Sequence, residues 1–345
     1  MSVHKSKKRK TTQEVTADTS KPTAVFKPAK GRQHTVSIAL PGSIIANVAT
    51  PDLKSRLAGQ IARACAVFCV DEVVIFDDGQ AEVGPPEHDG YTAFRDPNFF
   101  LYHVLSYLET PPHLRKALFP MHPDLKTAGA LPSLDMPHHL RGDEWCPYRE
   151  AIAIRQKKNA DGTFGTLLDC GLPQHVYLPV VMEEKTRVTV KLPEHAPSSG
   201  GEVSCQAVSP DAPREEAGYY WGYSVRQAPS LSSIFTECPH DGGYDMSIGT
   251  SERGIPVSSV LADDESHVAP EWNHLLIVFG GVAGLEAALS SDTELLEAGV
   301  TDPKELFDRY VNLVPGQGSR TIRTEEAVWA GLTALRPLVD IRNAV

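Results

Sequence analysis

The body of the chain opens with an alternation of apolar and amphipathic segments. From Thr35, the run VSIALPGSI is continuously apolar until Pro41-Gly42, which predicts a buried strand. A helix then begins at Pro51, and its apolar face consists of Leu53, Leu57, Ile61 and Ala64. A second apolar run, EVVIFDD, stops at Asp77-Asp78-Gly79. This order predicts parallel strands joined by a right-handed crossover.

The middle of the chain changes from helical to strand-like patterns. After a predicted loop over residues 80–96, the pattern indicates helices over Phe99–Leu108 and Leu114–Phe119. From Met136 to Pro213 there follow five short strand patterns, AIAIRQ, TFGTLLDC, HVYLPVV, TRVTVKL and EVSCQAV. Strands at this spacing without helices predict a small β-barrel inserted into an α/β domain. Such a barrel could bind RNA through Arg155, Lys157, Lys158, Lys185, Arg187 and Lys191, or it could be purely structural.

The C-terminal part returns to strands separated by helices. YYWGYSVR, YDMSIGTS and NHLLIVFGG are strand patterns, and LSSIFTEC is a short helix. The last unit runs from Asn312 to Leu335 as a strand, the turn PGQG and a helix capped by Thr321 or Thr324. Its predicted buried face is Val328, Gly331, Leu332 and Leu335.

Three of these strands end in loops that contain glycine: TSERG, FGG and PGQG. Open α/β sheets bind ligands at the carboxyl ends of their strands, so this edge is a candidate binding site. The same glycines are also typical of an ordinary turn between a strand and a helix. The loops match neither the Walker A pattern nor GxGxxG.

Several of these motifs carry a family resemblance. PGQGSRTIRTEEA resembles the last motif of the SPOUT (SpoU–TrmD) class of RNA methyltransferases, and in particular the GxRILRTETA ending of its uridine-N3 ribosomal RNA methyltransferases. IGTSERG and LLIVFGGVAGLE precede it in the order of that class. ALPGSI, LAGQIARACAVFCVDEVVIFD and YYWGYSVR are similar to the eukaryotic branch that includes centromere protein 32. The resemblance covers residues 35–335.

The resemblance implies a fold and an activity. The fold would be a SPOUT α/β trefoil-knot methyltransferase domain with an inserted OB-like β-barrel. We therefore divide the chain into a disordered basic tail (1–32), the first part of the SPOUT domain (33–135), the barrel (136–213) and the second part with the knot (214–345). The activity would be the S-adenosylmethionine-dependent methylation of a uridine at N3 in large-subunit ribosomal RNA, by a homodimer.

The resemblance also assigns candidate site residues. The predicted cofactor contacts are Arg253, Gly281, Asn312, Leu313, Gly316, Gly318, Thr321 and Ile322. The predicted catalytic residues are Arg253, as the cation that stabilises a uridine anion, and Glu286, with Arg320 and Arg323 as secondary candidates. Arg253 could instead hold the methionine carboxylate or an RNA phosphate, and any of these charges could be a surface ion pair.

Composition limits the alternatives. The 345 residues are 41% hydrophobic, with no apolar run of 18 residues and no apolar segment behind MSVHKSKKRK, which argues against a membrane span and a secretory signal. Six scattered cysteines without a CxxC pair are read as reduced thiols, mostly in the core. Residues 1–32 hold nine Lys or Arg and two Asp or Glu, a net +7, which leaves −18 on the rest of a chain whose total is −11.

This charge distribution keeps several functions open. An acidic body is unfavourable for binding phosphates, so the basic tail, a local basic face or a partner must attract RNA, unless the body never touches it. The tail is either a nuclear localisation signal or a solubilising segment, and we expect a nuclear or nucleolar protein that could also be cytoplasmic. The alternatives are a non-catalytic RNA-binding or spindle/kinetochore factor and a methyltransferase for proteins or small molecules.

Other candidate chemistry is weaker. His138-His139 and Cys146 lack a fourth ligand at zinc-finger spacing, so no metal is predicted there. His113 and His122 have no partner in the sequence pattern. Ser251 and Ser319 lack evident His and Asp partners, which argues against a hydrolase triad.

Overall fold

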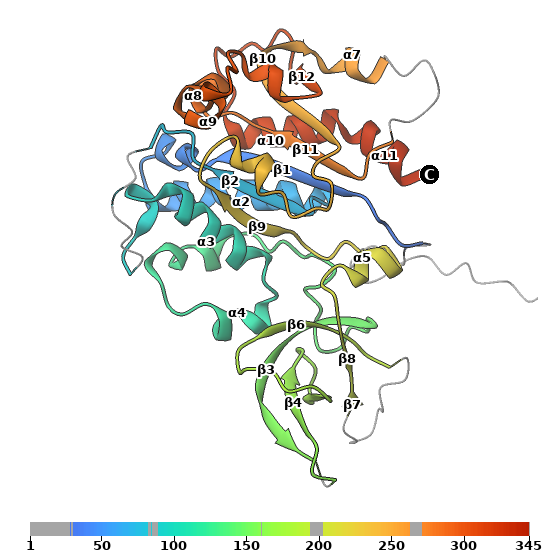
Figure 1. The fold of residues 1–345 in the computed structure, drawn as a ribbon. Helices are drawn as coiled ribbons and strands as arrows, with labels where there is room; N and C mark the ends of the chain where they lie inside the picture. Colours follow the sequence, from blue (N-terminus) through green and yellow to red (C-terminus); the bar gives the residue numbers. More distant parts are fainter. Residues whose placement is uncertain are drawn as a thin grey trace, which may run out of the picture.

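A computed structural model describes residues 28, 30–81, 84, 89–159, 161–193, 203–262 and 271–344. Nearly all of the predicted basic tail lies outside these residues. The described chain contains two six-stranded sheets, one in each half of the molecule as drawn in Figure 1. The fold is therefore mixed α/β, with the strand-rich segment separate from the parallel sheet, and no described helix is long and apolar enough to cross a bilayer.

The first sheet is parallel throughout and has the order β12-β10-β11-β1-β2-β9. Its strands are β1 (Thr35–Pro41), β2 (Glu72–Phe76), β9 (Ser224–Ala228), β10 (Met246–Pro256), β11 (His274–Val278) and β12 (Arg309–Asn312). The predicted opening β-α-β unit is confirmed, since β1 pairs with β2 in parallel on either side of α2 (Pro51–Phe68). The remaining helices are α3 (Pro97–Glu109), α4 (Pro112–Leu118), α5 (Ala212–Ala217), α6 (Ser233–Thr236), α7 (Val257–Ala262), α8 (Gly284–Ser291), α9 (Thr293–Glu297), α10 (Thr324–Ala334) and α11 (Arg336–Ala344).

Local sequence explains the ends of α2. Pro51 occupies its first turn, where a missing N–H costs nothing, and the Thr50 hydroxyl accepts the backbone N–H of Leu53 at 3.4 Å. The helix stops at Cys69, which has a left-handed φ of 56°. The predicted buried face is correct from Leu57 onward, but Leu53 is 44% exposed, and Lys54 and Ser55 are buried in the first turn instead.

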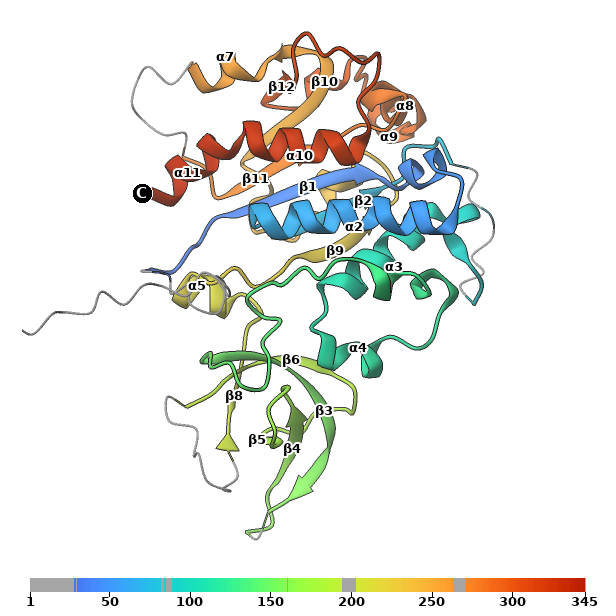
Figure 2. The ribbon, with the colours of Figure 1, turned by 180° about the vertical axis from the view of Figure 1, so that it is seen from behind.

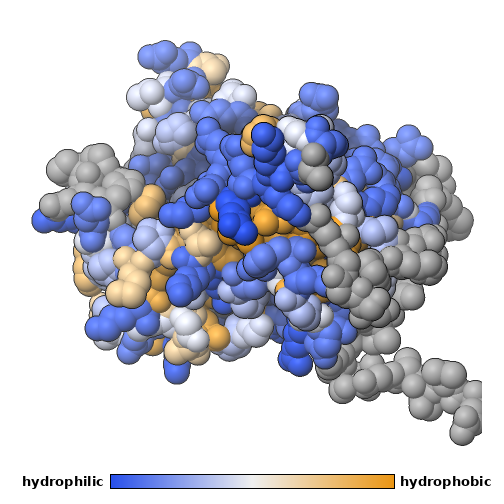
Figure 3. Space-filling model, turned by 90° about the horizontal axis from the view of Figure 1, so that it is seen from below, coloured by the Kyte–Doolittle hydropathy of each residue, from blue (hydrophilic) through white to orange (hydrophobic). Residues whose placement is uncertain are grey.

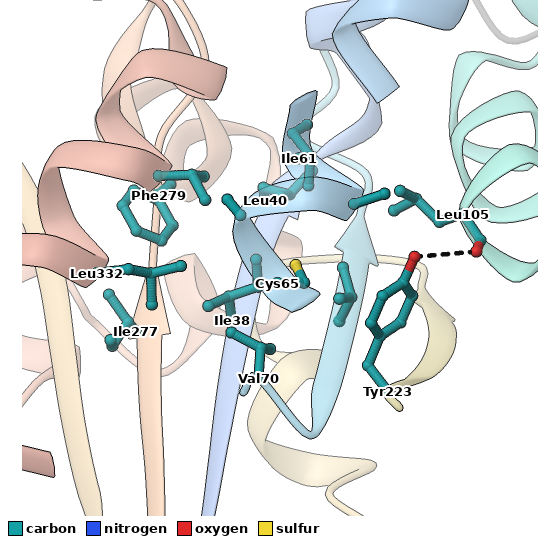
Figure 4. Close-up of a cluster of buried hydrophobic side chains, with 14 of the residues drawn as sticks. Ile38, Leu40, Ile61, Cys65, Val70, Leu105, Tyr223, Ile277, Phe279 and Leu332 are labelled. Atoms are coloured by element: carbon teal, nitrogen blue, oxygen red, sulfur yellow. Dashed lines mark hydrogen bonds between the residues drawn. The ribbon is translucent and has the colours of Figure 1, made fainter. Parts of the chain in front are cut away.

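Hydrophobic cores cover both faces of the parallel sheet. On one face, Ile38 and Leu40 of β1 pack with side chains of α2, α3 and α10, and α2 and α10 lie side by side in Figure 2. Figure 4 shows part of this core, in which the Tyr223 hydroxyl donates to the Leu105 carbonyl at 3.1 Å. On the other face, Ala39 of β1 packs with residues of α6 and α8. The alternation of Ile38, Ala39 and Leu40 between faces follows the two-residue period of a strand.

The second sheet has the order β7-β5-β4-β3-β6-β8. Its strands are β3 (Tyr148–Lys158), β4 (Phe164–Asp169), β5 (Val176–Leu178), β6 (Arg187–Lys191), β7 (Val203–Ser204) and β8 (Gln206–Val208). The single segment Val203–Val208 pairs with β5 at one edge and with β6 at the other, which closes the sheet in part. The predicted strand runs are confirmed. Seen from this end, the surface is mostly hydrophilic, with apolar side chains gathered near its centre (Figure 3).

A buried ionic network joins the second sheet to α3. Arg187 of β6 contacts both Glu109 at 2.8 Å and Glu150 at 2.6 Å, and the side-chain exposures of these carboxylates are 8% and 3%. His138 Nε2 lies 2.8 Å from Glu109 Oε1, while His139 Nε2 bonds the Glu109 carbonyl at 2.6 Å. His138 and His139, for which no metal is predicted, thus both contact Glu109 at this junction. Arg187, predicted as an RNA contact, is committed to the network instead.

Two predicted elements are wrong in extent. Only the end of YYWGYSVR forms a strand, because Tyr220, Trp221 and Tyr223 turn inward and are buried. The predicted turn TSERG lies inside β10, where a bulge between Thr250 and Ile255 interrupts pairing with Val311. Gly254 is required in this bulge, since a Cβ there would lie 2.4 Å from the backbone of Val311.

The predicted cap of the last helix is also wrong. Arg323 occupies the N-cap position of α10, and its backbone N–H is bonded by the Glu326 carboxylate at 3.0 Å. Thr324 is the first helical residue, and Thr321 lies before the cap. The predicted buried face is confirmed, because the four residues are all buried: Val328, Gly331, Leu332 and Leu335. All six cysteines are free, and four of them are buried.

Candidate functional site

A cavity of about 590 Å³ opens at the carboxyl ends of β10, β11 and β12. Its walls come from the β10 bulge, from the loop Phe279–Gly284 after β11 (the glycine loop) and from residues 312–327 after β12. A further wall comes from α2 and from Asn47 and Val48, which follow β1. Parallel strands bring their carboxyl ends to one edge, so segments far apart in sequence meet here.

The glycine loop is folded tightly against its own backbone. The Gly284 N–H donates to the Gly281 carbonyl at 3.0 Å, and a Cβ on Gly280 would lie 2.9 Å from the Gly284 backbone. The Thr324 hydroxyl donates to the Gly280 carbonyl at 2.9 Å, which fixes the start of α10 to this loop. Without side chains at Gly280 and Gly281, main-chain groups form this wall of the cavity.

A buried carboxyl group supports the glycine loop from behind. A Cβ on Gly281 would lie 3.1 Å from Asp78 Oδ2, and the Ser43 hydroxyl donates to that oxygen at 2.7 Å. Burial raises the pKa of the Asp78 carboxyl, while the bond from Ser43 opposes the rise. Asp78 is not among the cavity-lining residues, so it acts as packing behind the loop.

Asn312 connects two walls of the cavity. Its side-chain Nδ2 donates to the Glu252 carbonyl at 2.9 Å, and its Oδ1 accepts the Val314 N–H at 3.1 Å. The residue lines the cavity as predicted, but its amide is engaged with protein on both atoms. Asn312 therefore positions the β10 bulge and the loop after β12, and Leu313 lies beside it on the lining.

The structure brings the two predicted catalytic residues together. Arg253 Nη1 lies 3.1 Å from Glu286 Oε1, and both residues line the cavity. Their side chains are 72% and 35% exposed, so the pair adds little to folding stability and its guanidinium is accessible from the cavity mouth. Ser251 accepts the Arg253 N–H at 3.2 Å, and none of the described histidines bonds to it, which agrees with the absence of a triad.

The loop after β12 contains most of the other predicted site residues, and only some of them line the cavity. Thr321, Ile322, Arg320 and Arg323 line the cavity, together with Gly281 from the glycine loop. Gly316 and Gly318 do not line it, although Gln317 between them does. Gly316 has φ +74°, and a Cβ on either glycine would meet nothing within 4 Å. The two glycines lie in the turn that places Gln317 at the cavity, and their predicted contact with the cofactor stays a prediction.

Sequence reasoning missed one wall of the cavity. Asn47, Val48 and Leu57 line it, as do Thr324 and Ala327 at the start of α10. The signal lay in the run ALPGSI, because β1 is parallel to β11 and its carboxyl end must reach the same sheet edge. Three exposed arginines, Arg253, Arg320 and Arg323, also line the cavity, and three glutamates of the same lining balance their charge: Glu252, Glu286 and Glu325.

Comparison with known proteins identifies the family of the chain. The family described as "Putative RNA methyltransferase" matches residues 35–335. The chain is 46% identical over 317 residues to the human 28S rRNA (uridine-N(3))-methyltransferase, which covers 91% of this chain and 81% of that protein. Identity to the mouse protein of the same name is 45% over 310 residues, 89% of this chain and 77% of that protein.

A third relative extends the comparison to insects. The 28S rRNA (uridine-N(3))-methyltransferase of Drosophila melanogaster is 43% identical over 316 residues, which is 89% of this chain and 63% of that protein. The family match includes every strand of both sheets and every wall of the cavity. The chain belongs to this family of RNA methyltransferases.

Proposed function

We propose that the protein is an S-adenosylmethionine-dependent methyltransferase that modifies N3 of a uridine in large-subunit ribosomal RNA. The observation that carries the proposal is the cavity in which the β10 bulge, the glycine loop and the loop after β12 meet. Three relatives at 43–46% identity are named for this reaction on 28S rRNA. The arginines at the cavity mouth suit a polyanionic substrate.

The lining residues fit the methyl donor. Leu57, Phe279, Leu313 and Ala327 supply apolar surface for an adenine ring, and the glycine loop supplies main-chain groups for its edge. Four lining residues would contact the cofactor: Gly281, Leu313, Thr321 and Ile322. Asn312 would hold the β10 bulge against the loop after β12 through its bond to Glu252. The donor, when bound, supplies an electrophilic methyl group on a sulfonium.

Arg253 is the proposed catalytic cation. Transfer of the N3 proton to solvent water makes the uracil ring an anion, and an accessible guanidinium nearby stabilises the charge that develops. Glu286 holds this guanidinium at 3.1 Å and so fixes its direction without burying it. Positioning of the base supplies the rest of the acceleration. The uridine must lie in a loop or be flipped out, because N3 is paired inside a duplex.

The finer fold assignment is part of the proposal. The parallel order β12-β10-β11-β1-β2-β9 and the three ligand loops support a SPOUT domain with a trefoil knot, in the branch of centromere protein 32. The part-closed second sheet supports an OB-like barrel. The proposed boundaries are 33–135, 136–213 and 214–345, after the basic tail.

A two-fold partner would complete the site. Four exposed apolar residues surround the cavity on its three loops, namely Ile255, Val282, Val314 and Ile322. Val282 is 75% exposed, which is unusual for a side chain in the middle of a ligand loop. A second copy of the chain that covers these residues accounts for their exposure, and a homodimer is therefore proposed. Nuclear or nucleolar action follows from a ribosomal RNA substrate.

The test combines cells and purified protein. Nucleosides from large-subunit RNA are quantified by mass spectrometry after deletion of the gene and rescue with wild type, Arg253→Gln or Arg309→Gln. Arg309 is an exposed arginine at the opposite end of β12 and serves as the matched control. Loss of N3-methyluridine that wild type and the control restore, but Arg253→Gln does not, supports the proposal.

The opposite outcomes are informative. Unchanged N3-methyluridine in the deleted cells overturns the assigned reaction. If the purified chain also fails to bind S-adenosylmethionine in calorimetry, a non-catalytic RNA-binding or spindle factor replaces the enzyme. If it binds the cofactor but leaves ribosomal RNA unchanged, the substrate is another RNA, a protein or a small molecule.

A further inference from the structure

Three potential metal ligands meet beside α3, away from the cavity. His103 projects from α3, Asp124 lies in the 3-10 helix η3 (Pro123–Leu125) that follows α4, and His122 is the N-cap of η3. Their ligand atoms all lie within 4.8 Å of one another. His122, which has no partner in the sequence pattern, lies beside Asp124 and His103, and the rings of the two histidines are 4.6 Å apart.

The distances within this cluster suit a tetrahedral ion. His103 Nδ1 and His122 Nδ1 lie 3.2 and 3.3 Å from the same oxygen, Asp124 Oδ2. Charge-assisted bonds between such groups are shorter, at about 2.7–2.9 Å. Ligands at about 2.0–2.1 Å from a tetrahedral zinc ion stand about 3.3–3.4 Å apart. Both observed separations are close to that edge length.

Neighbouring groups orient the ligands as a metal site requires. Thr92 donates its backbone N–H to Asp124 Oδ1 and its hydroxyl to Asp124 Oδ2, both at 2.8 Å. The ring of Phe119 stacks on His103 with centroids 5.9 Å apart. Hydrogen-bonded carboxylates and fixed imidazoles are characteristic of the second layer around metal ligands.

Metal binding would replace hydrogen bonds that the cluster makes without the ion. The His122 Nδ1 lone pair accepts the Asp124 backbone N–H at 3.2 Å, and it would turn to the ion instead. His103 Nδ1, which lies 3.2 Å from Asp124 Oδ2, would coordinate as a deprotonated nitrogen, because metal ligands must be free of the proton.

We propose that His103, His122 and Asp124 bind a divalent transition-metal ion of the zinc type, with water as the fourth ligand. Two imidazoles and one carboxylate favour zinc over calcium or magnesium, which prefer oxygen ligands throughout. The side chains of the two histidines are 12% and 13% exposed, which leaves one side open for the water. None of the three residues lines the cavity.

The ion would hold together three segments of the chain. It would link α3 to the connection after α4, and through Thr92 it would also fix the loop before α3. The connection after α4 contains only short 3-10 helices, so it has few backbone bonds of its own. The role of the ion is structural, independent of the proposed methyl transfer.

The experiment uses the full chain, stripped with a chelator and then titrated with Zn²⁺ or Co²⁺ alone. We expect one equivalent of metal per chain, the intense visible bands of tetrahedral Co²⁺ and a rise in melting temperature with Zn²⁺. His122→Gln should abolish all three. His175→Gln changes an exposed histidine outside the cluster and should leave them intact.

A second variant tests the site without removing a ligand, so the test does not depend on the folding of His122→Gln. Thr92→Val keeps all three ligands but removes one bond to Asp124, and it should weaken metal binding by about 10–100-fold. If the wild-type chain gives no tetrahedral Co²⁺ bands, the cluster is only a hydrogen-bonded junction and the proposal is overturned. Equal binding by wild type and His122→Gln overturns it as well.

Discussion

Glu109→Gln tests the junction between the two sheets. The carboxylate of Glu109 receives Arg187 through two contacts, at 2.8 and 3.1 Å, and His138 through a third at 2.8 Å. Burial by itself raises the pKa of Glu109, but Arg187 and His138 outweigh it and hold the pKa at about 2, below the ordinary value of 4.5. Glutamine keeps the shape and removes the charge.

The pKa gives the size of the effect. A folded-state pKa below the unfolded value means that the ionised group stabilises the fold above pH 4.5 and loses this effect as the pH falls toward 2. At 1.36 kcal/mol per pH unit, the contribution is about 3 kcal/mol at pH 7 and about half of that at pH 3. The raised pKa of Arg187 describes the same contact, so it is not added.

Urea unfolding of wild type and Glu109→Gln measures this contribution. We expect the variant to lose about 3 kcal/mol at pH 7, with a difference that shrinks steadily to about half by pH 3. Glu297→Gln removes an exposed carboxylate and should match wild type throughout. A loss below about 0.5 kcal/mol at pH 7, or one that does not change with pH, would refute the reasoning.

Three further predictions concern the cavity. Thr324→Val removes the hydroxyl that donates to the glycine loop, and it should weaken S-adenosylmethionine binding about fivefold, because one hydrogen bond contributes about 1 kcal/mol. The control Thr333→Val on the same helix should bind the cofactor normally. Equal affinities of the two variants in calorimetry would contradict this prediction. Gly254→Ala forces a Cβ against the backbone of β12 and should lower the free energy of unfolding in urea by about 2 kcal/mol or more. Gly129→Ala places its Cβ in open space and should leave the free energy of unfolding unchanged. Identical unfolding curves for the two variants would show that the bulge can relax. Val282→Asp places a charge on the proposed dimer face and should shift light-scattering mass toward the monomer, and an unchanged mass would move the interface elsewhere.

Local sequence predicted much of the fold. The runs VSIALP, EVVIF and NHLLIV have almost no polar interruption because parallel strands are buried on both faces, and they form β1, β2 and β11. The apolar period of α10 gave its buried face correctly. Errors occurred at ends and turns, where a tertiary contact decides: the bulge of β10 exists because that strand pairs with β12 on both sides of it.

The candidate site residues were also predicted where a local motif marks them and missed where tertiary structure brings them to the cavity. Three residues that the motifs predicted for the site line the cavity: Arg253 lies in the bulge of β10, Gly281 in the glycine loop and Glu286 in the first turn of α8. They did not indicate Asn47, which lies more than 200 residues earlier in the chain and reaches the cavity only because β1 is parallel to β11.

Sequence alone therefore determined the strands, the main helices, the second sheet and the family motifs, since periodicity and turn chemistry are properties of neighbouring residues. Tertiary structure alone decided which charged side chains pair with one another inside the protein. The charge of Arg187 made it a candidate RNA contact, but Glu109, 78 residues away in the chain, pairs with it. His103 of α3 lies beside His122 and Asp124 because the fold packs these segments together. Charges and ligands act through space over a few ångströms, and the fold sets those distances.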